Sequence, residues 1–150
     1  SGQRWQWDGV SFSVWRWAGA RDSNQDSCVL LVEASGERLL LTGDLDAPGE
    51  RAWARDWQAT RVDWLQSPHH GSRSSSSQAL LSATAPRGVL ISRGRHNAFG
   101  HPHAEVMERY RTNGIEVFDS AVRGALRLRL GDFREPSGMR DQPRFWRDPS

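Results

Sequence analysis

The chain alternates short apolar runs with polar segments, and the spacing of its apolar positions changes several times between that of strands and that of helices. Residues 10–14 alternate apolar and polar side chains, which predicts a half-buried strand. Residues 28–34 are mostly apolar, which is typical of a strand buried on both faces. Ser35 and Gly36 then predict a tight turn into a second strand over 38–42. The first part of the chain therefore predicts a hairpin within a sheet.

Three helices are predicted to alternate with the remaining strands. The first begins at residues 47–50, where a proline suits the first turn, and Trp53 and Trp57 give it an apolar stripe toward the sheet. The second follows a serine N-cap, which is Ser76 or Ser77. The other predicted bounds are 78–84 for this second helix, Pro102 to a C-cap at Asn113 and Gly114 for the third, and strands at 62–66, 88–92, 115–118 and 125–130.

This order of elements predicts an α/β (α+β) fold, a mixed β-sheet with helices and with its functional loops along one edge. With 150 residues and 37% hydrophobic content, the chain can form one domain with a core, which we assign to residues 1–133. The single cysteine, Cys28, is expected to pack there as a small hydrophobic residue. Residues 134–150 combine prolines with charge and predict a disordered tail. No apolar run has the length of a membrane span, so we expect a soluble polypeptide.

The charge of the chain is unevenly distributed. All 20 basic residues are arginine, and the absence of lysine excludes a P-loop, whose lysine contacts the phosphates. The net charge is only +2, but residues 64–104 contain no Asp or Glu while they hold all five histidines. The same stretch carries Arg73, Arg87, Arg93 and Arg95. Such a stretch suits an anion, for example a phosphodiester, and also fits a solvated basic face.

Asp44 and the pair His69-His70 each follow a predicted strand, and the two strands are consecutive along the chain. An Asp and a His at the C-terminal ends of neighbouring strands meet at one sheet edge, where carboxylate oxygen and imidazole nitrogen suit zinc or manganese. On an extended segment the two histidines point in opposite directions, so one can be a ligand while the other contacts the substrate. Asp44 alone also fits a turn or a helix cap, and the histidine pair also fits a structural role.

A second group of candidate residues lies in the long loop 93–102. His101, beside Asn97 and Gly100, is predicted to cap the third helix and to contact a phosphate or protonate a leaving group, and Asn97 is the second catalytic candidate. The spacing of His101 and His103 resembles a metal-binding pair, but Pro102 between them favours a helix start. A serine hydrolase is excluded because the chain has no Gly-x-Ser-x-Gly elbow. The candidate residues for binding substrate phosphate are Ser72, Arg73, Arg93 and Arg95.

Four motifs carry a family resemblance: Asn24–Leu30, Leu40–Asp44, His69–Ser72, and Ser92–Gly94 together with Asn97–Pro102. In this order they resemble the metallo-β-lactamase-type domain of the ComEC family of DNA-internalisation competence proteins. The resemblance implies a metal-dependent phosphodiesterase or nuclease domain attached to an inner-membrane DNA channel. It also implies an extracytoplasmic (periplasmic) location and action on the DNA strand that is not taken up in natural transformation.

The resemblance also implies roles for single residues. Asp44 would contact or bridge the metal ions, one of His69 and His70 would be the late histidine ligand, with His69 favoured, and Asn97 and His101 would line the substrate side. The family's early His-rich motif lies before the matched region, and this chain has no histidine before His69. The chain would then be the C-terminal half of an αββα sandwich. We expect weak metal binding and no turnover from it alone.

The expected partners are DNA, as single strand or duplex, and the membrane channel portion of the same parent chain. A homodimer through a sheet edge left bare by the missing half is a further expectation. Two other functions stay open from the sequence. One is a non-catalytic DNA-binding or assembly module, which would bind single strands without metal and in a salt-dependent manner. The other is a hydrolase of another phosphodiester, because sibling metallo-β-lactamase branches carry the same His-His-Gly-Ser segment.

Overall fold

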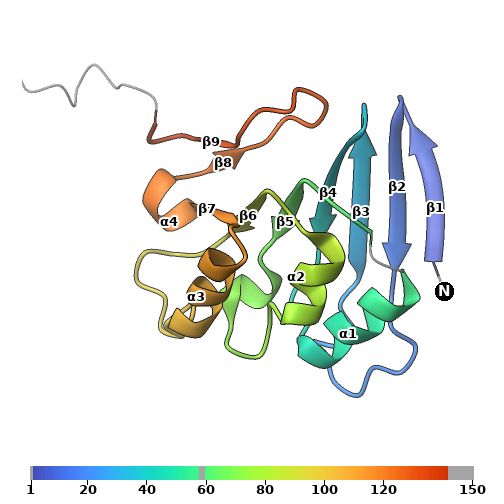
Figure 1. Cartoon of the computed structure of the whole chain (residues 1–150), viewed down its shortest axis with the longest axis horizontal. Helices are drawn as coiled ribbons and strands as arrows, with labels where there is room; N and C mark the ends of the chain where they lie inside the picture. Colours follow the sequence, from blue (N-terminus) through green and yellow to red (C-terminus); the bar gives the residue numbers. More distant parts are fainter. Residues whose placement is uncertain (1, 58–59, 142–150) are drawn as a thin grey trace, which may run out of the picture.

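The computed structural model describes residues 2–57 and 60–141 and is organised around one seven-stranded sheet (Figure 1). The strands lie side by side in chain order. Strands one to four pair antiparallel with their neighbours, and strands four to seven pair parallel. The predicted mixed sheet with helices is therefore confirmed. The strands are β1 Gly2–Trp7, β2 Val10–Trp15, β3 Val29–Ala34, β4 Glu37–Leu41, β5 Trp64–Gln66, β6 Gly88–Ile91 and β7 Glu116–Asp119.

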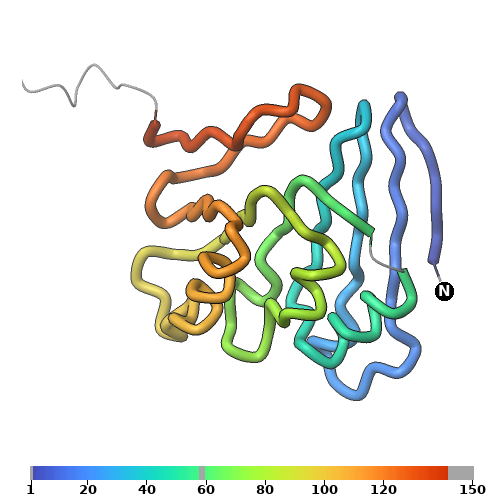
Figure 2. Tube along the Cα trace, in the orientation of Figure 1, coloured from blue at the N-terminus to red at the C-terminus, as the bar shows by residue number. Residues whose placement is uncertain are grey.

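Three helices cover one face of the sheet, each in the connection between two neighbouring parallel strands (Figures 1 and 2). Parallel strands require such crossover connections. Asp46 caps α1 by accepting a hydrogen bond from the Gly49 backbone N–H, and Ser77 caps α2. The helices are α1 Ala47–Asp56, α2 Gln78–Thr84 and α3 Ala104–Thr112. The core between them and the sheet contains Leu40, Leu65, Val89 and Ile91 from the strands and Trp53, Leu80, Val106 and Tyr110 from the helices.

The opposite face of the sheet is also apolar, although these three helices do not cover it. Along β3 and β4, the residues of this face alternate with Val29, Leu31 and Leu40, which are buried under the helices. Within the predicted strand 28–34, the helix-covered face is buried at Val29 and Leu31 but only partly at Glu33, and the other face is partly buried. The half-buried apolar residues of the opposite face include Leu30, Val32, Leu39, Leu41 and Leu90.

The C-terminal segment differs from its prediction. The strand predicted at 125–130 is limited to β8 (Leu126–Arg127), which follows the short helix α4 (Ser120–Arg123) and pairs with β9 (Ser137–Gly138). Residues from 134 to 141 were expected to belong to a disordered tail. They fold back because Asp141 accepts hydrogen bonds from the Arg123 guanidinium, at 2.5 and 2.9 Å, and from the Gly138 N–H. Residues 142–150 of the predicted tail lie outside the described residues.

Three further details depart from the predictions. β1 was not predicted, because the alternation of Trp5 and Trp7 with Arg4 and Gln6 covers only four residues, and all residues of the strand are exposed. Cys28 is exposed and precedes β3, whereas packing in the core was expected. The third helix begins at Ala104 and not at Pro102, and His103 is its N-cap. Within the described residues, no helix combines the length and the apolar character needed to cross a bilayer.

Glu37 is fully buried and connects the start of β4 to the C-terminal segment. Its carboxylate accepts hydrogen bonds from the Trp64 indole at 2.7 Å and from the backbone N–H groups of Gly131 and Phe133 at 2.7 and 3.0 Å. The Arg87 guanidinium lies 3.3 Å from the same carboxylate. One buried charge therefore ties residues 131–133 to the sheet.

The serine run after the His69-His70 turn is part of a second buried polar network. The carboxylate of Glu50, on α1, accepts hydrogen bonds from the backbone N–H groups of Ser76 and Ser77, each at 2.6 Å. The hydroxyl of Tyr110 lies 2.6 Å from Ser76 Oγ and 2.8 Å from Ser67 Oγ. Burial raises the pKa of Tyr110 to about 12, so its hydroxyl keeps its proton near neutral pH. The network joins α1, α2 and α3, and it includes Ser67, the residue before the histidine turn.

The buried carboxyl of Glu50 makes the stability of the fold depend on pH, and the direction of its pKa shift gives the direction of this dependence. Burial raises the pKa of its carboxyl above the ordinary value of 4.5. Its contribution to stability is therefore complete below pH 4.5 and is lost as the pH rises through the folded-state pKa. We expect Glu50→Gln to remove this dependence, so that the wild type's stability relative to the variant falls with rising pH, by at most about 1.4 kcal/mol per pH unit. Urea unfolding at several pH values measures this difference.

The control for this prediction is Glu116→Gln, because Glu116 is exposed. We expect its unfolding free energy to run parallel to that of the wild type across the same pH range. A wild type that gains stability relative to Glu50→Gln as the pH rises would contradict the raised pKa of Glu50.

Candidate metal centre

Asp44 lies in the loop after β4, and this loop is fixed to the end of β5. The Gln66 side-chain carbonyl accepts hydrogen bonds from the backbone N–H groups of Thr42 and Gly43 at 3.0 and 3.1 Å. Thr42 Oγ1 donates to the Gln66 carbonyl at 3.1 Å. Gly43 has a φ of +56°, a left-handed conformation that favours glycine. Asp44 is thus held at the sheet edge, as the sequence predicted, with half of its side chain exposed.

The two histidines lie in a tight turn, Pro68–Gly71, and not in the extended segment that was predicted. His69 and His70 have φ angles of +47° and +56°. Two consecutive non-glycine residues in the left-handed region are unusual, and each costs about 1–3 kcal/mol. The His69 N–H donates to the Gly43 carbonyl at 3.0 Å, which fixes this turn to the Asp44 loop. The backbone there is a left-handed turn and not the extended segment from which the alternation of the two side chains was predicted.

His70 and Asp44 form the central pair of the site. His70 Nδ1 lies 2.7 Å from the Ser92 carbonyl, which can only accept, so Nδ1 carries the proton. In the neutral imidazole the lone pair of His70 is then on Nε2, which lies 3.7 Å from Asp44 Oδ1. Two ligands of one zinc ion, each about 2.0–2.2 Å from the metal, are separated by roughly 3–4 Å. A metal-binding histidine typically donates its other N–H to a carbonyl in this way. The donor set and its spacing fit a divalent metal ion.

His69 is the second nitrogen donor close to this pair. Its Nδ1 is buried and has no hydrogen-bond partner among the described residues. Its ring centroid lies 6.4 Å from that of His70 and 5.8 Å from that of His101. Within residues 2–57 and 60–141, no group of three His, Cys, Asp or Glu side chains is arranged to hold a metal ion. The described residues therefore provide a partial ligand set.

His101 faces the same site but does not cap α3. The cap is His103, whose Nδ1 accepts a hydrogen bond from the Glu105 N–H at 3.3 Å. Burial, with the neighbouring His69, His70 and His103, lowers the pKa of His101. The neutral imidazole is thus favoured near neutral pH, which is less suited to donating a proton than the sequence prediction assumed.

Asn97 holds the backbone of His101. Its side-chain oxygen accepts from the His101 N–H at 2.8 Å, and its Nδ2 donates to the His101 carbonyl at 2.8 Å. Both ends of the amide therefore contact the loop. In this structure Asn97 shapes the position of His101, whereas the sequence predicted a direct contact with substrate.

The arginines of the carboxylate-free stretch have acidic or carbonyl partners from elsewhere in the chain. Arg73 pairs with Glu105 at 2.9 Å. Arg93 pairs with Asp119 at 2.6 Å, and Arg95 Nε donates to the Ala121 carbonyl at 3.1 Å. The fold thus neutralises much of the charge that appeared unpaired in the sequence. Ser72 Oγ lies 3.2 Å from Ser74 Oγ, beside Arg73.

A pocket of about 360 Å³ opens beside the Asp44-His70 pair. Sequence analysis identified most of its residues but missed Phe99, whose side chain is exposed and contacts His101. Two sequence signals included Phe99 without singling it out: the fourth motif of the resemblance, and its place inside a long loop, where binding residues are frequent. The lining residues are His70, Ser92, Arg93, Gly94, Asn97, Phe99 and His101.

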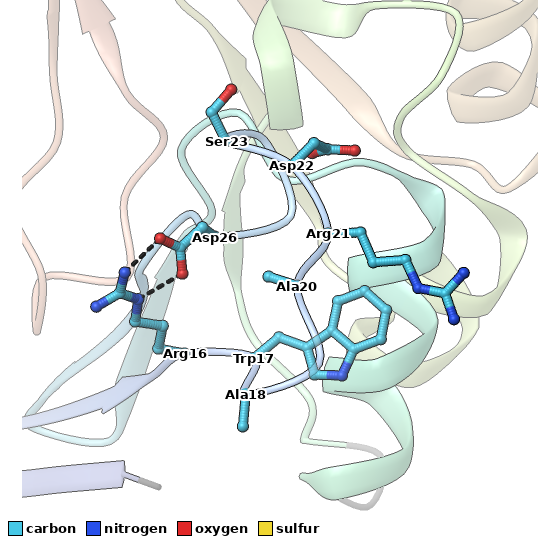
Figure 3. Close-up of a pocket in the computed structure, with 8 residues that line it drawn as sticks. All are labelled: Arg16, Trp17, Ala18, Ala20, Arg21, Asp22, Ser23 and Asp26. Atoms are coloured by element: carbon cyan, nitrogen blue, oxygen red, sulfur yellow. Dashed lines mark hydrogen bonds and ion pairs between the residues drawn. The ribbon is translucent and has the colours of Figure 1, made fainter.

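A second hollow, of about 520 Å³, is formed by the loop between β2 and β3 (Figure 3). Both carboxylate oxygens of Asp26 accept hydrogen bonds from Arg16 across this loop. The buried side chain of Gln25 donates to Asp22 at 2.9 Å and to the α1 cap Asp46 at 3.1 Å. The motif Asn24–Leu30, which contains Gln25, therefore supports the start of α1 through the cap residue Asp46.

Gly71 allows the histidine turn and the Pro102 segment to approach one another. Its φ is +82°, and an added Cβ would lie 2.6 Å from Pro102 Cβ. We expect Gly71→Ala to destabilise the fold by at least about 2 kcal/mol, from the backbone conformation and the steric overlap together. Urea unfolding measures the effect.

Gly100→Ala is the matched control for Gly71→Ala. Gly100 has a φ of +66°, but no atom lies within 4 Å of an added Cβ. It should therefore show only the backbone part of the cost. Equal losses in both variants would show that the contact between Gly71 and Pro102 contributes nothing.

Comparison with known proteins places the chain in a family. Residues 2–95 match the metallo-beta-lactamase superfamily, and the chain belongs to it. The chain is 42% identical over 132 residues to competence protein ComA of Neisseria gonorrhoeae, which is 86% of this chain and 19% of that protein. It is 38% identical over 130 residues to recombination protein 2 of Haemophilus influenzae (85% and 16%), and 31% identical over 106 residues to ComE operon protein 3 of Bacillus subtilis (71% and 14%).

The resemblance that the four motifs carried is thus confirmed at the level of the family. The chain is similar to competence proteins and contains the metallo-β-lactamase match within residues 2–95. It spans less than a fifth of the length of each of these relatives.

Proposed function

We propose that the chain is part of a metal-dependent phosphodiesterase or nuclease domain of a competence DNA-uptake protein. The observation that carries this proposal is the convergence of Asp44 and His70, with the His70 lone pair on the nitrogen that faces the carboxylate. Oxygen and nitrogen donors of this kind suit zinc or manganese. The left-handed backbone at both histidines supports a functional role for the turn, since strained residues concentrate at such sites.

Asp44 and His70 would hold the metal ion, and the unpaired Nδ1 of His69 makes this histidine a further candidate ligand. The geometry favours His70 over His69 as the first ligand, in contrast to the preference from sequence. A bound divalent cation stabilises negative charge on the phosphoryl oxygens of a phosphodiester. The chain's own residues would position the substrate: His101 contacts the ester from the pocket wall, and Asn97 fixes the position of His101.

The candidate phosphate-binding residues take more limited roles in this proposal. Arg93 is committed to Asp119 and mainly shapes the pocket, while Arg95 holds the loop to Ala121. Arg73 is exposed and its pair with Glu105 is open to solvent, so a phosphate can compete for it. Ser72 lies next to it at the end of the histidine turn.

The remaining ligands would come from another segment of a longer parent protein. The half-exposed apolar face of the sheet supports this part of the proposal, because a second layer packed on it would bury Leu30, Val32 and Leu39. The chain would then be the C-terminal half of an αββα sandwich. A homodimer of the chain alone, through the exposed edge strand β1, stays a prediction.

The same proposal includes the setting of the domain. We infer a place on the periplasmic side of the inner membrane, attached to the channel portion of the parent and acting on the DNA strand that is not taken up. The similarity to competence proteins supports this setting. In this setting the proposed hydrolase site would face DNA outside the channel.

The experiment that tests the function is hydrolysis of labelled single-stranded and duplex DNA by the parent protein, with and without Mn²⁺ or Zn²⁺. We expect cleavage that depends on the metal and stops with a chelator. The isolated chain should show no turnover under the same conditions. Metal-independent DNA binding with no cleavage by the parent would replace the proposal with a non-catalytic binding module.

A further inference from the structure

Phe99 has the most exposed of the large hydrophobic side chains among the described residues. The residue is 81% exposed, although it lines the pocket that also holds His70 and His101. Such a ring contributes little to the core, and this one lies on a pocket wall within a long loop, where binding residues are frequent. Its neighbours in the pocket indicate which kind of group it could bind.

Phe99 stands at the end of a continuous series of rings that leads to the candidate metal ligands. Its ring stacks on His101, with centroids 5.8 Å apart and an interplanar angle of 29°. His101 in turn lies edge-on to His69, at 5.8 Å. His69 adjoins His70, whose Nε2 faces Asp44. A group stacked on Phe99 would lie in the pocket that His70 also lines, and His70 Nε2 faces Asp44.

The loop that presents Phe99 is fixed on both sides. Before it, the Arg93 N–H donates to Ser120 Oγ at 2.9 Å, and Ser120 Oγ donates back to the Arg93 carbonyl at 3.0 Å. After it, the Asn97 amide holds both backbone groups of His101. The exposed ring is thus presented by an anchored loop. Such preorganisation lowers the entropy cost of binding a flat partner.

We propose that Phe99 stacks against an unpaired nucleobase of the nucleic acid whose phosphodiester lies at the Asp44-His70 site. This inference rests on the proposed function, and it narrows the substrate from any phosphodiester to a strand with an accessible base. A base stacks on an aromatic side chain only when it is not stacked in a duplex. The pocket volume of about 360 Å³ is at the lower end for ligand sites, which suits one base and not a folded partner.

The test measures binding by the chain in the presence of a chelator, so that neither catalysis nor metal affects it. Two fluorescent single strands of equal length are compared by anisotropy, one normal and one with abasic residues. We expect Phe99→Ala and Phe99→Leu to weaken binding of the normal strand about tenfold, the typical effect of losing one stacked base. Phe99→Trp should retain binding. The abasic strand should bind all four proteins alike.

Phe133→Ala is the matched control, because Phe133 is another exposed phenylalanine and lies outside the pocket lining. It should bind both strands like the wild type. The inference is overturned if Phe99→Ala changes neither strand, if it weakens both strands equally, or if the wild type does not bind the normal strand. Metal-dependent cleavage that requires Asp44 in the parent, without any effect of Phe99, would leave the proposed function intact and remove only the stacking site.

Discussion

Asp44→Ala in the parent protein is expected to reduce metal-dependent hydrolysis of DNA by more than about 100-fold. Loss of a residue that hydrogen-bonds to a metal ligand already costs about 10–100-fold in metal affinity or activity, and loss of the ligand itself should cost more. Half of the Asp44 side chain is exposed, and its carboxylate is not part of the buried networks. The fold should therefore survive the change. Initial rates at saturating metal measure the loss, and circular dichroism checks the fold.

Glu108→Ala is the control for this variant. Glu108 is an exposed carboxylate on α3 that pairs with Arg111 in the same helix. It should keep wild-type rates. Hydrolysis that is equally insensitive to Asp44→Ala and Glu108→Ala would exclude Asp44 from the site.

The same assay decides between the two histidines. His70→Ala should reduce the rate as strongly as Asp44→Ala, because His70 Nε2 faces that carboxylate and its Nδ1 is held by Ser92. His96→Ala, at an exposed position of the neighbouring loop, is its control. A loss confined to His69→Ala would return the ligand role to the residue that the sequence favoured.

Glu37→Ala is expected to destabilise the fold by about 3–5 kcal/mol, as is typical when one partner of a buried charged network is removed. The Trp64 indole and the N–H groups of Gly131 and Phe133 would lose their acceptor, and Arg87 would lose its buried partner. The loss is a large part of the 5–15 kcal/mol of an ordinary domain. Urea unfolding measures it, and amide hydrogen exchange should rise first at residues 131–133.

Glu33→Ala is the comparison for Glu37→Ala. Glu33 pairs with Arg38 on β4, and both side chains are substantially exposed. Its loss should cost less than about 1 kcal/mol, as for surface pairs in general. A similar, small loss in both variants would mean that Glu37 does not anchor the C-terminal segment.

The regular elements of the fold were predictable because their signals are local. The turn at Ser35 and Gly36, the start of α1 and the serine cap of α2 each depend on a few adjacent residues. β1 escaped prediction because its alternation of Trp5 and Trp7 with polar residues is short. The contact between Glu37 and Gly131 joins residues 94 positions apart, and no local pattern reports such a contact.

The candidate site was predictable in its chemistry but not in its geometry. Asp44 and the histidine pair follow neighbouring strands, so their meeting followed from topology. Which of His69 and His70 is the better candidate ligand depends on a left-handed turn and on a hydrogen bond from His70 to the carbonyl of Ser92. Ser92 follows β6, so only the fold brings this carbonyl to the histidine turn. The pairing of Arg93 with Asp119 likewise required the fold, and it removes a charge that the sequence left free.

Calorimetric titration with Zn²⁺ and Mn²⁺ tests the central claim most directly. It compares this chain with a version extended N-terminally to include the parent's early His-rich segment. We expect tight binding by the extended protein alone, with Asp44→Ala and His70→Ala each abolishing it in that background. Failure of the extended protein to bind either metal, or binding that is unchanged by both substitutions, would contradict a metal centre at Asp44 and His70.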